Sequence, residues 1–494
     1  AYEIRLSLVG SEMCIRDRKN DTLQSAKMRS MPMGRLLLNM SLPAIISMFI
    51  DALYTIVDSM FLSQYSQVAF EAVGISFPMV MIKISLALGI GVGANVFISR
   101  KLGEGDREGA DNVARTAVFL SIIGSLLFVA LAFTVSVPFM KLFTEDAEMI
   151  DMGNEYLIYM LGLSVFSVVS IVAQKLLQAT GNMKAPMVSQ ALGAIVNIIL
   201  DPIFIFDEFW GMKCLNMGVA GAAIATIIGQ FVACAYVILV FIVKKQDVSI
   251  NLAKMKLKWN TVWNIFRIGL PTFILNALGS FTTIILNSIL KAYPNGIRVL
   301  TIYFSTQSFV FMPVFGLMQG TLPILSYNLG ANDRARYNDC WKRSLITSVA
   351  IMAVGLLLFQ ICPGLIVDIF ETTPSLREDT IYAFRCISWC FLPASLGILL
   401  VTTFQSLNIG LFSMFLSMSR QLIFLIPMAY LLDYFFQMSG LFYAYPIAET
   451  LSLVIFAPIA LRCYRKVFKK RGEMSDDGSG DEEHAELSVS TTSD

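Results

Sequence analysis

Ionisable and amide side chains occur at a few positions inside otherwise apolar stretches of this sequence. Asn197 and Asp201 lie four residues apart in AIVNIILDPIFIF. Asp51 and Asp58 lie seven residues apart in LPAIISMFIDALYTIVDSMFL. On a helix, each spacing places both side chains on one face. Because a charged side chain within hydrocarbon costs about 2.5–3.5 kcal/mol on insertion scales, we expect these residues to serve a function.

The depths of these residues predict that oxygen-bearing side chains meet. Counted along its apolar segment, Asp201 lies about 22 Å from the entry point, with Asp51 at the same level and Asp58 higher. Thr226, early in the next segment, also falls in the outer half. Carboxylates that converge in a poorly hydrated pocket cannot all stay ionised. The sequence therefore predicts a site for H⁺ or a small hard cation, beside a helix kink at Pro202. The alternative is a hydrogen-bonded polar cluster that only bends the helices.

Three further charges lie within apolar segments. Lys83 is expected either to pair with Asp51 or Asp58, and so to modulate the site, or to extend its ammonium to the interface. A paired lysine would favour H⁺ over Na⁺ as the bound ion. Arg420 and Glu449, in the second half of the chain, are expected to form a structural ion pair between neighbouring helices.

The composition defines the elements that must hold these side chains. The chain has 494 residues, 56% hydrophobic and 15% charged, with mean hydropathy +0.67, whereas globular domains carry about 25% charged residues. Apolar blocks of about 20 residues or more predict membrane-spanning helices, because lipid offers the backbone no hydrogen-bond partners. The predicted fold is all-α and polytopic, with twelve transmembrane helices at about 36–62, 73–99, 113–139, 156–177, 186–206, 219–243, 263–289, 299–326, 343–367, 384–405, 412–434 and 440–462.

The positive charges between these segments predict the orientation. On the side of the two termini there are 26 Lys and Arg residues, and on the opposite side six. Since short loops rich in Lys and Arg stay in the cytoplasm, both termini are expected there, in a multi-pass protein of the plasma (inner) membrane.

The two halves of the chain repeat each other. RKLGEGDREGA matches YNLGANDRARY, which aligns Gly103 with Gly330 at a spacing of 227 residues, and the helix-kinking Pro43 matches Pro271. Six spans per half predict two lobes in the same orientation, related by an axis along the membrane normal. Glycines in GIGVGAN are expected to let helices approach closely. Two such lobes suit a carrier that offers its substrate to each side in turn.

The expected organisation follows from these boundaries. It comprises an extension resembling translated adapter sequence (1–18), a cytoplasmic segment (19–35), the N-terminal lobe (36–243), a linker (244–262), the C-terminal lobe (263–462) and a disordered tail, basic then acidic (463–494). The single histidine, His484, lies in that tail, and the eight cysteines form no CxxC pair. We expect no enzyme activity, no cofactor beyond H⁺ or Na⁺ as the coupling ion, no nucleic-acid partner, and a monomer in the lipid bilayer.

Several segments together resemble the multidrug and toxic compound extrusion (MATE) family, in its bacterial branch. They are LPAIISMFIDALYTIVDSMFL, GIGVGANVFISRKLGEGD, LLQATGNMKAPMVSQALGAIVNIILDPIFIF and GVAGAAIATIIGQ, within about 33–471. The resemblance implies a V-shaped pair of six-helix lobes that exports amphipathic, often cationic compounds in exchange for H⁺ or Na⁺. It also implies that Asp58, Asn197, Asp201 and Thr226 form the cation-coupling site. Acidic residues that some members carry on spans 7 and 10 are missing here.

Two other functions remain possible from the sequence. A flippase for lipid-linked sugars would need a strongly cationic cavity, and the intramembrane cations are Lys83 and Arg420. A channel or receptor would not need the internal duplication or the titratable pocket.

Overall fold

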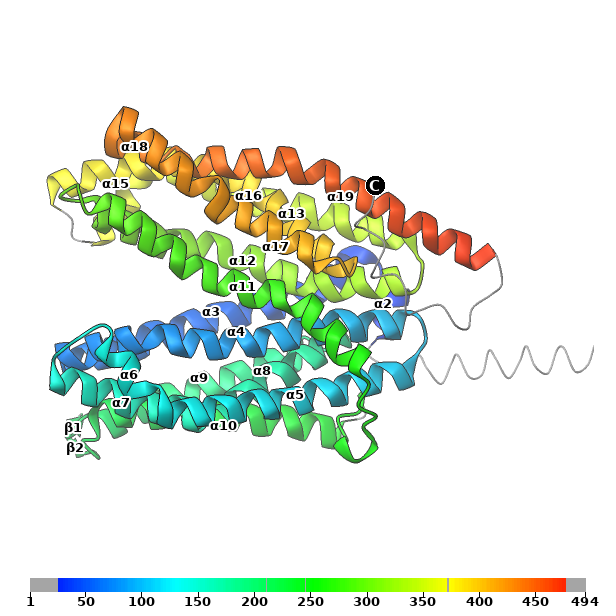
Figure 1. Cartoon of the computed structure of the whole chain (residues 1–494), viewed down its shortest axis with the longest axis horizontal. Coiled ribbons are helices and arrows are strands. Elements are labelled where there is room, and N and C mark those ends of the chain that lie inside the picture. The colour runs from blue at the N-terminus through cyan, green and yellow to red at the C-terminus, as the bar shows by residue number, and fades with distance from the viewer. Residues whose placement is uncertain (1–24, 210, 245, 371–372, 477–494) are drawn as a thin grey trace, which may run out of the picture.

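The computed structural model describes residues 25–209, 211–244, 246–370 and 373–476, and it is almost entirely helical (Figure 1). The first half contains α2 (Ala26–Ser30), α3 (Met33–Tyr65), α4 (Gln67–Gly103), α5 (Arg107–Thr134), α6 (Ser136–Lys141), α7 (Ala147–Gly162), α8 (Ser164–Ala179), α9 (Lys184–Ile205) and α10 (Gly218–Val243). An antiparallel hairpin of β1 (Glu208–Phe209) and β2 (Met212–Lys213) joins α9 to α10.

The second half repeats this order after the 3₁₀ turn η1 (Leu252–Lys254). It contains α11 (Trp259–Leu290), α12 (Gly296–Gly330), α13 (Arg334–Ile361), α14 (Pro363–Val367), η2 (Asp368–Phe370), α15 (Pro374–Ile387), η3 (Ser388–Cys390), α16 (Phe391–Ser406), α17 (Gly410–Met418), the π-helical turn η4 (Ser419–Ile423), α18 (Leu425–Leu441) and α19 (Ala444–Asp476).

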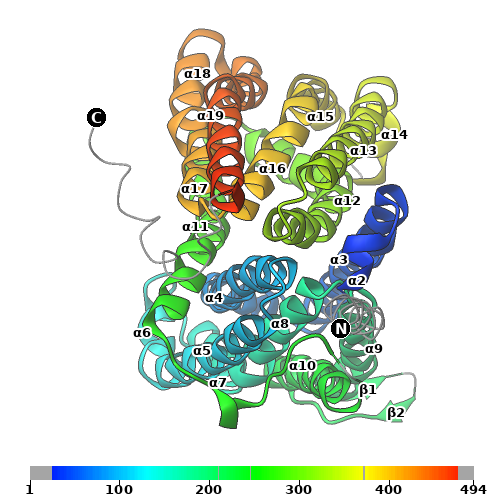
Figure 2. The ribbon, with the colours of Figure 1, turned by 90° about the vertical axis from the view of Figure 1, so that its right-hand side faces the viewer.

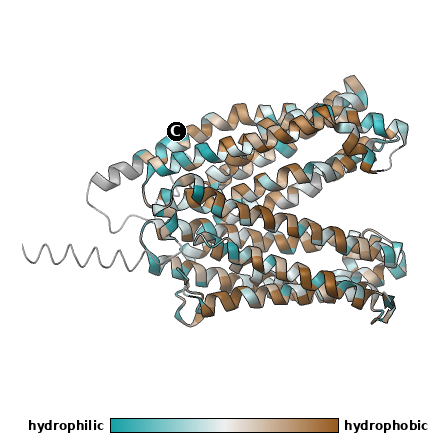
Figure 3. Cartoon of the chain, turned by 180° about the vertical axis from the view of Figure 1, so that it is seen from behind, coloured by the Kyte–Doolittle hydropathy of each residue, from teal (hydrophilic) through white to brown (hydrophobic). Residues whose placement is uncertain are grey.

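The helices have the lengths that a membrane requires. Among the described residues, ten helical segments are long and apolar enough to cross it, if α15 to α16 (Pro374–Ser406) and α17 to α18 (Gly410–Leu441) each count as one segment. Helices α7 and α8, bent by 49° at their junction, can form an eleventh span. The remaining predicted segment, 263–289, lies within α11. Apolar residues follow the middles of the helices, and hydrophilic ones gather at the two ends (Figure 3). The predicted all-α membrane fold is therefore confirmed.

Two predicted boundaries differ from the structure. Helix α19 continues to Asp476, so the segment predicted as a disordered tail is helical over 463–476, because the Lys and Arg residues that follow the last span are good helix formers. The linker predicted over 244–262 contains η1 and the first turn of α11. The predicted extension 1–18 and the acidic end with His484 lie outside the described residues.

The internal repeat is visible in the backbone. Helix α8 ends at Ala179 and α16 at Ser406, 227 residues later. Asp106 and Asp333, also 227 apart, both cap the helix that follows by accepting a backbone N–H three residues on. Positive φ angles recur at Gly105 and Asn332, and at Gly181 and Asn408. Asn replaces Gly there because its short polar side chain tolerates the left-handed conformation.

The two lobes meet through reciprocal glycine contacts. A Cβ at Gly103 would meet the carbonyl of Tyr327, and a Cβ at Gly330 would meet the carbonyl of Arg100, the repeat partner of Tyr327. At Gly89, a Cβ would lie 3.2 Å from the carbonyl of Gly269 in α11. The predicted role of the glycines in close helix packing is thus confirmed, with α4 and α12 crossing at their ends.

The lobes separate toward the other end of the molecule. In Figure 1 the helices of the two halves lie close where α4 and α12 end, and they diverge toward the side of the β1–β2 hairpin. Figure 2, viewed along the helices, shows α4–α10 grouped on one side and α12–α19 on the other. We call the end with Gly103 and Gly330 the closed end, and the opposite one the open end.

Candidate cation site

Helix α9 carries the amide and the carboxylate that stand out in its sequence. Asn197 and Asp201 are 1% and 0% exposed, so the helix turns both toward the interior of the N-terminal lobe. Asn197 Nδ2 donates to Asp201 Oδ1 at 3.0 Å. The helix continues past Pro202, which has no N–H to offer the carbonyl of Ile198. One polar strip therefore faces inward within an apolar helix.

Helix α10 brings Thr226 to this strip. Asn197 Nδ2 also donates to Thr226 Oγ1 at 3.2 Å, and Thr226 is 4% exposed. The approach depends on glycines, because a Cβ at Gly193 would lie 3.0 Å from the carbonyl of Gly229 on α10. This close packing brings two oxygen-bearing side chains of different helices within reach of one amide.

Helix α3 adds the second carboxylate. Asp58 is half-buried and interacts electrostatically with Asp201. Asp58 Oδ1, Asn197 Oδ1 and Asp201 Oδ2 are all buried, and none has a hydrogen-bond partner among the described residues. Buried oxygens without donors are costly, at about 1–3 kcal/mol each. The structure thus brings Asp58, Asn197, Asp201 and Thr226 together, with three oxygens free to bind a positively charged species.

Two tyrosines complete the surroundings, and the sequence reasoning missed both. Tyr54 of α3 lies near Thr226 and within electrostatic range of Asp58 and Asp201. Tyr156 of α7 is 8% exposed and lies within electrostatic range of Asp58 and Asp201. Tyr54 precedes Asp58 by one helical turn and shares its face, so helical spacing could have found it. No sequence signal marks Tyr156, since it comes from a distant helix.

Asp51 stands apart from the site. It is exposed, and its Oδ1 accepts a hydrogen bond from Gln190 Nε2 at 2.7 Å. Gln190 precedes Asp201 by about three turns of α9, so Asp51 does not lie at the level of Asp201 as predicted. The count assumed that both helices enter the membrane upright at their first charged residue.

Lys83 does not form the predicted salt bridge, and it does not extend to the interface. Its side chain is 1% exposed, and Nζ donates to the backbone carbonyl of Met160 at 2.8 Å. Within the described ranges, no carboxylate lies within salt-bridge distance of this ammonium. A main-chain acceptor, which sequence patterns do not show, replaces Asp51 and Asp58 as its partner.

The second lobe contains the predicted ion pair. Arg420 donates to Glu449 Oε1 through Nε at 2.9 Å and through Nη2 at 2.6 Å. The two side chains are 13% and 14% exposed. Arg420 lies in the π-helical turn η4, and Gly397 leaves room for it, because a Cβ there would lie 3.1 Å from Nη1.

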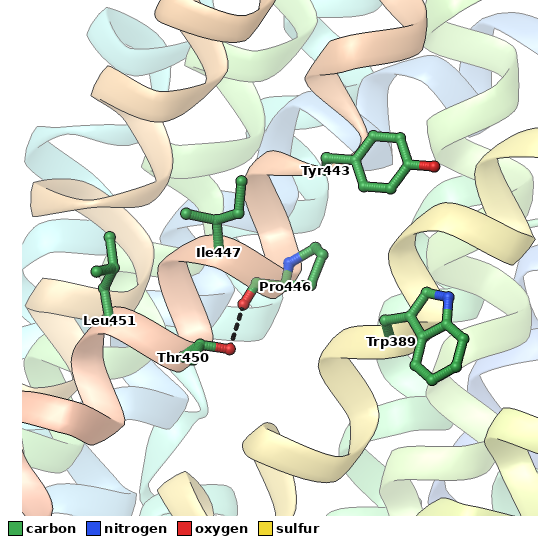
Figure 4. A pocket seen from close by; sticks show the side chains of 6 residues that line it. All are labelled: Trp389, Tyr443, Pro446, Ile447, Thr450 and Leu451. Carbon is green, nitrogen blue, oxygen red and sulfur yellow. Dashed lines mark hydrogen bonds between the residues drawn. The ribbon is translucent and has the colours of Figure 1, made fainter.

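An apolar groove of about 400 Å³ lies elsewhere in the second lobe (Figure 4). It runs between η3 and the start of α19, where the Thr450 hydroxyl donates to the carbonyl of Pro446. Its lining residues are Trp389, Tyr443, Pro446, Ile447, Thr450 and Leu451. The lining contains no carboxylate, so the groove offers none of the chemistry of the candidate site.

Comparison with known proteins places the chain in a family. The sequence profile of the MatE family matches residues 43–203 and 270–431, once in each half. The multidrug export protein MepA of Staphylococcus aureus (strain NCTC 8325 / PS 47) is 25% identical over 429 residues, covering 85% of this chain and 92% of that protein. MepA of Staphylococcus haemolyticus is 24% identical over 430 residues, covering 86% and 93%.

Solved structures share the fold. A MATE transporter in its bent conformation superposes with a TM-score of 0.84 at 24% identity, covering 91% of this chain and 99% of that one. A MOP superfamily transporter from Pyrococcus furiosus gives 0.82 at 23% identity, covering 89% and 97%. Since the family profile spans both lobes and more than half of the sequence, the chain belongs to the MatE family.

Proposed function

We propose that this protein is a cation-coupled antiporter that exports amphipathic, often cationic, compounds across the plasma membrane. The coupling ion is H⁺ or Na⁺, and it binds among Asp58, Asn197, Asp201 and Thr226. The names of the MepA relatives, which are multidrug export proteins, support export of drug-like compounds.

One observation carries the coupling part of the proposal. Three buried oxygens of Asp58, Asn197 and Asp201 point into the site without hydrogen-bond partners among the described residues. Asp58 and Asp201 interact electrostatically, and two buried carboxylates repel each other unless a cation or proton neutralises one of them. Binding of the ion removes that repulsion, and the arrangement of α3 and α9 changes with it.

The lobe arrangement supports alternating access. The glycine contacts between α4 and α12 seal the closed end, while the lobes diverge toward the open end. The excess of Lys and Arg at the closed end favours its placement in the cytoplasm. In this state an external ion reaches the site through half-buried Asp58. A membrane potential of 100 mV supplies about 2.3 kcal/mol per charge, roughly a fiftyfold gradient.

The test uses the purified protein in proteoliposomes loaded with a fluorescent lipophilic cation. Imposed pH and Na⁺ gradients are compared for the parent protein and for Asp201→Asn. We expect the parent to move the dye against its gradient with saturable kinetics, as a carrier does and a channel does not. Asp201→Asn should still bind the dye but lose the response to either ion gradient, because one anionic oxygen of the site is gone.

The control is Asp51→Asn, since Asp51 lies outside the site and bonds Gln190. Its gradient response should stay close to that of the parent. Parent-like export by Asp201→Asn would contradict the assigned site. Dye movement by the parent that ignores both gradients would contradict cation coupling altogether.

A further inference from the structure

A buried lysine lies at the break of the fourth span. Lys83 is 1% exposed, and its Nζ donates to the carbonyl of Met160 at 2.8 Å. Burying an ammonium without a carboxylate is costly unless its surroundings supply negative partial charge. The position of Met160 in its helix provides that charge.

Met160 lies in the last turn of α7. The helix ends at Gly162, Leu163 leaves helical geometry at φ −107° and ψ 25°, and α8 begins at Ser164 with a bend of 49°. The last carbonyls of a helix lack intrahelical donors and form the negative end of its dipole. A cation that donates a hydrogen bond there stabilises the end of the helix. Lys83 of α4 thus caps the break from a neighbouring helix.

The capped turn leads directly to the candidate site. Tyr156 precedes Met160 by four residues, so the two share one face of α7. Both belong to one buried apolar cluster with Ala223 and Ile227 of α10, which flank Thr226. The same cluster contains Met79 and Val80 of α4, the turn before Lys83. Packing therefore joins the lysine, the end of α7 and the wall of the site in one body.

Resting on the proposed function, we propose that Lys83 is a positioning residue for the cation site: by capping the end of α7, it holds Tyr156 beside Asp58 and Asp201. Tyr156 lies within electrostatic range of both carboxylates. Without the cap, the last turn of α7 frays and the tyrosine loses its fixed place. Lys83 touches neither the ion nor the exported compound, so its effect appears in the affinity of the site for the ion.

The measurement is the half-saturating concentration of the coupling ion, whichever of H⁺ and Na⁺ drives the parent protein in proteoliposomes. Lys83→Met keeps the length and removes the donor and charge. We expect it to raise the half-saturating concentration about tenfold, which corresponds to 1.4 kcal/mol of lost binding free energy. The maximal rate should change much less. Lys83→Arg, which keeps a cationic donor, should restore most of the affinity. Lys141→Met, at an exposed lysine of the same lobe, should behave as the parent does.

A double-mutant cycle separates positioning from a general loss of packing. If Lys83 acts through Tyr156, then Lys83→Met should have little further effect in the Tyr156→Phe background. Additive effects would overturn the proposal, and so would an unchanged half-saturating concentration in Lys83→Met. If Lys83→Met does not fold, the shorter Lys83→Gln carries the same test. A parent protein without ion-driven export contradicts the proposed function, whereas a parent-like Lys83→Met in an active background contradicts this inference alone.

Discussion

The two lobes share one backbone plan but place opposite chemistry inside it. In the N-terminal lobe, two carboxylates, an amide and a hydroxyl leave three buried oxygens without partners in the described part of the chain. At the spacing of 228 residues that relates Pro43 to Pro271, the position of Asp58 in the C-terminal lobe holds Leu286. In the second lobe, the largely buried carboxylate of Glu449 is instead paired with Arg420.

The two lobes also differ in the contacts between their fifth and sixth spans. In the first lobe, Gly193 lets α9 pack directly against α10. In the second, Arg420 of the π-helical turn η4 pairs with Glu449 of α19. The proposed ion exchange therefore belongs to the first lobe, and the Arg420–Glu449 pair belongs to the fixed framework of the second.

The largest effect should come from neutralising a carboxylate in the first lobe. Asp58→Asn should abolish gradient-driven export, because the variant can no longer bind the coupling ion. A potential of 100 mV can drive a dye gradient of up to about fiftyfold, and this gradient should be lost. Replacing the whole ion pair of the second lobe, Arg420→Met with Glu449→Met, should leave coupling intact. Dye accumulation in proteoliposomes measures both. Loss of coupling in the double variant would show that both lobes exchange ions.

The next largest effect should come from breaking that pair on one side only. Arg420→Met leaves the Glu449 carboxylate largely buried without its partner, and it should destabilise the protein by about 3 kcal/mol or more. The double variant should lose much less, because no isolated charge remains. Thermal unfolding in detergent checks this. Equal losses in the single and double variants would contradict the paired arrangement.

A moderate effect should follow from substitutions at the closed end. Gly103→Ala or Gly330→Ala places a methyl group against the backbone of the other lobe and should weaken the closed end by about 1–3 kcal/mol. The population open at that end should rise, as spin-label distances between α4 and α12 can measure. Gly74→Ala in α4 is the matched control, since its Cβ would meet no atom within 4 Å. Similar shifts in all three variants would exclude a role of the reciprocal contacts.

The smallest effect should distinguish two equivalent helix caps outside the membrane. Asp106 Oδ1 accepts from the N–H of Gly109 at 2.8 Å, and Lys101 lies 3.0 Å from Oδ2. Asp333 accepts from Arg336 at 2.9 Å. Asp106→Ala should cost about 1 kcal/mol, and slightly more than Asp333→Ala, because it also removes the Lys101 pair. Thermal unfolding of the two variants at neutral pH compares them.

The same cap gives a pH dependence. Burial raises the pKa of Asp106, but the Gly109 N–H and the Lys101 ammonium outweigh it, so the pKa lies below its usual value. A depressed pKa stabilises the fold above the unfolded value, about 3.9, and this contribution is lost as the pH falls through the folded value. The difference between parent and Asp106→Ala should therefore shrink below about pH 4. A difference that stays constant down to pH 2 would contradict the carboxylate's part in the cap.

Sequence patterns predicted the membrane-spanning helices well, for a physical reason. About 20 apolar side chains contribute to the pattern of each span, so a few polar exceptions do not obscure it. The prediction that Asn197 and Asp201 share a face was correct because helical geometry fixes which side chains lie on one side of a helix. The ion pair of Arg420 and Glu449 was predictable because few other charges in the membrane could serve either of them.

Other parts of the site could not be predicted from the sequence. Lys83 donates to a main-chain carbonyl. Because every residue has such a carbonyl, side-chain types could not identify Met160 as the acceptor. The break that frees this carbonyl lies at Leu163, an ordinary helix former. Tyr156 comes within electrostatic range of the carboxylates through the packing of α7 on α10. The prediction of a disordered tail was wrong over 463–476, because a charged composition does not stop a helix that a long span has already nucleated.

The glycine contacts between the lobes also decide how deep the energy minimum of the closed end is. Where two backbones touch, no long side chains have to be frozen when the lobes join or released when they part. Buried apolar side chains of both halves also pack around this seam and favour the joined arrangement. The backbone contacts reduce the side-chain entropy lost on joining, and this brings the free energies of the two arrangements closer together. The binding energy of a single small ion is then enough to choose between them.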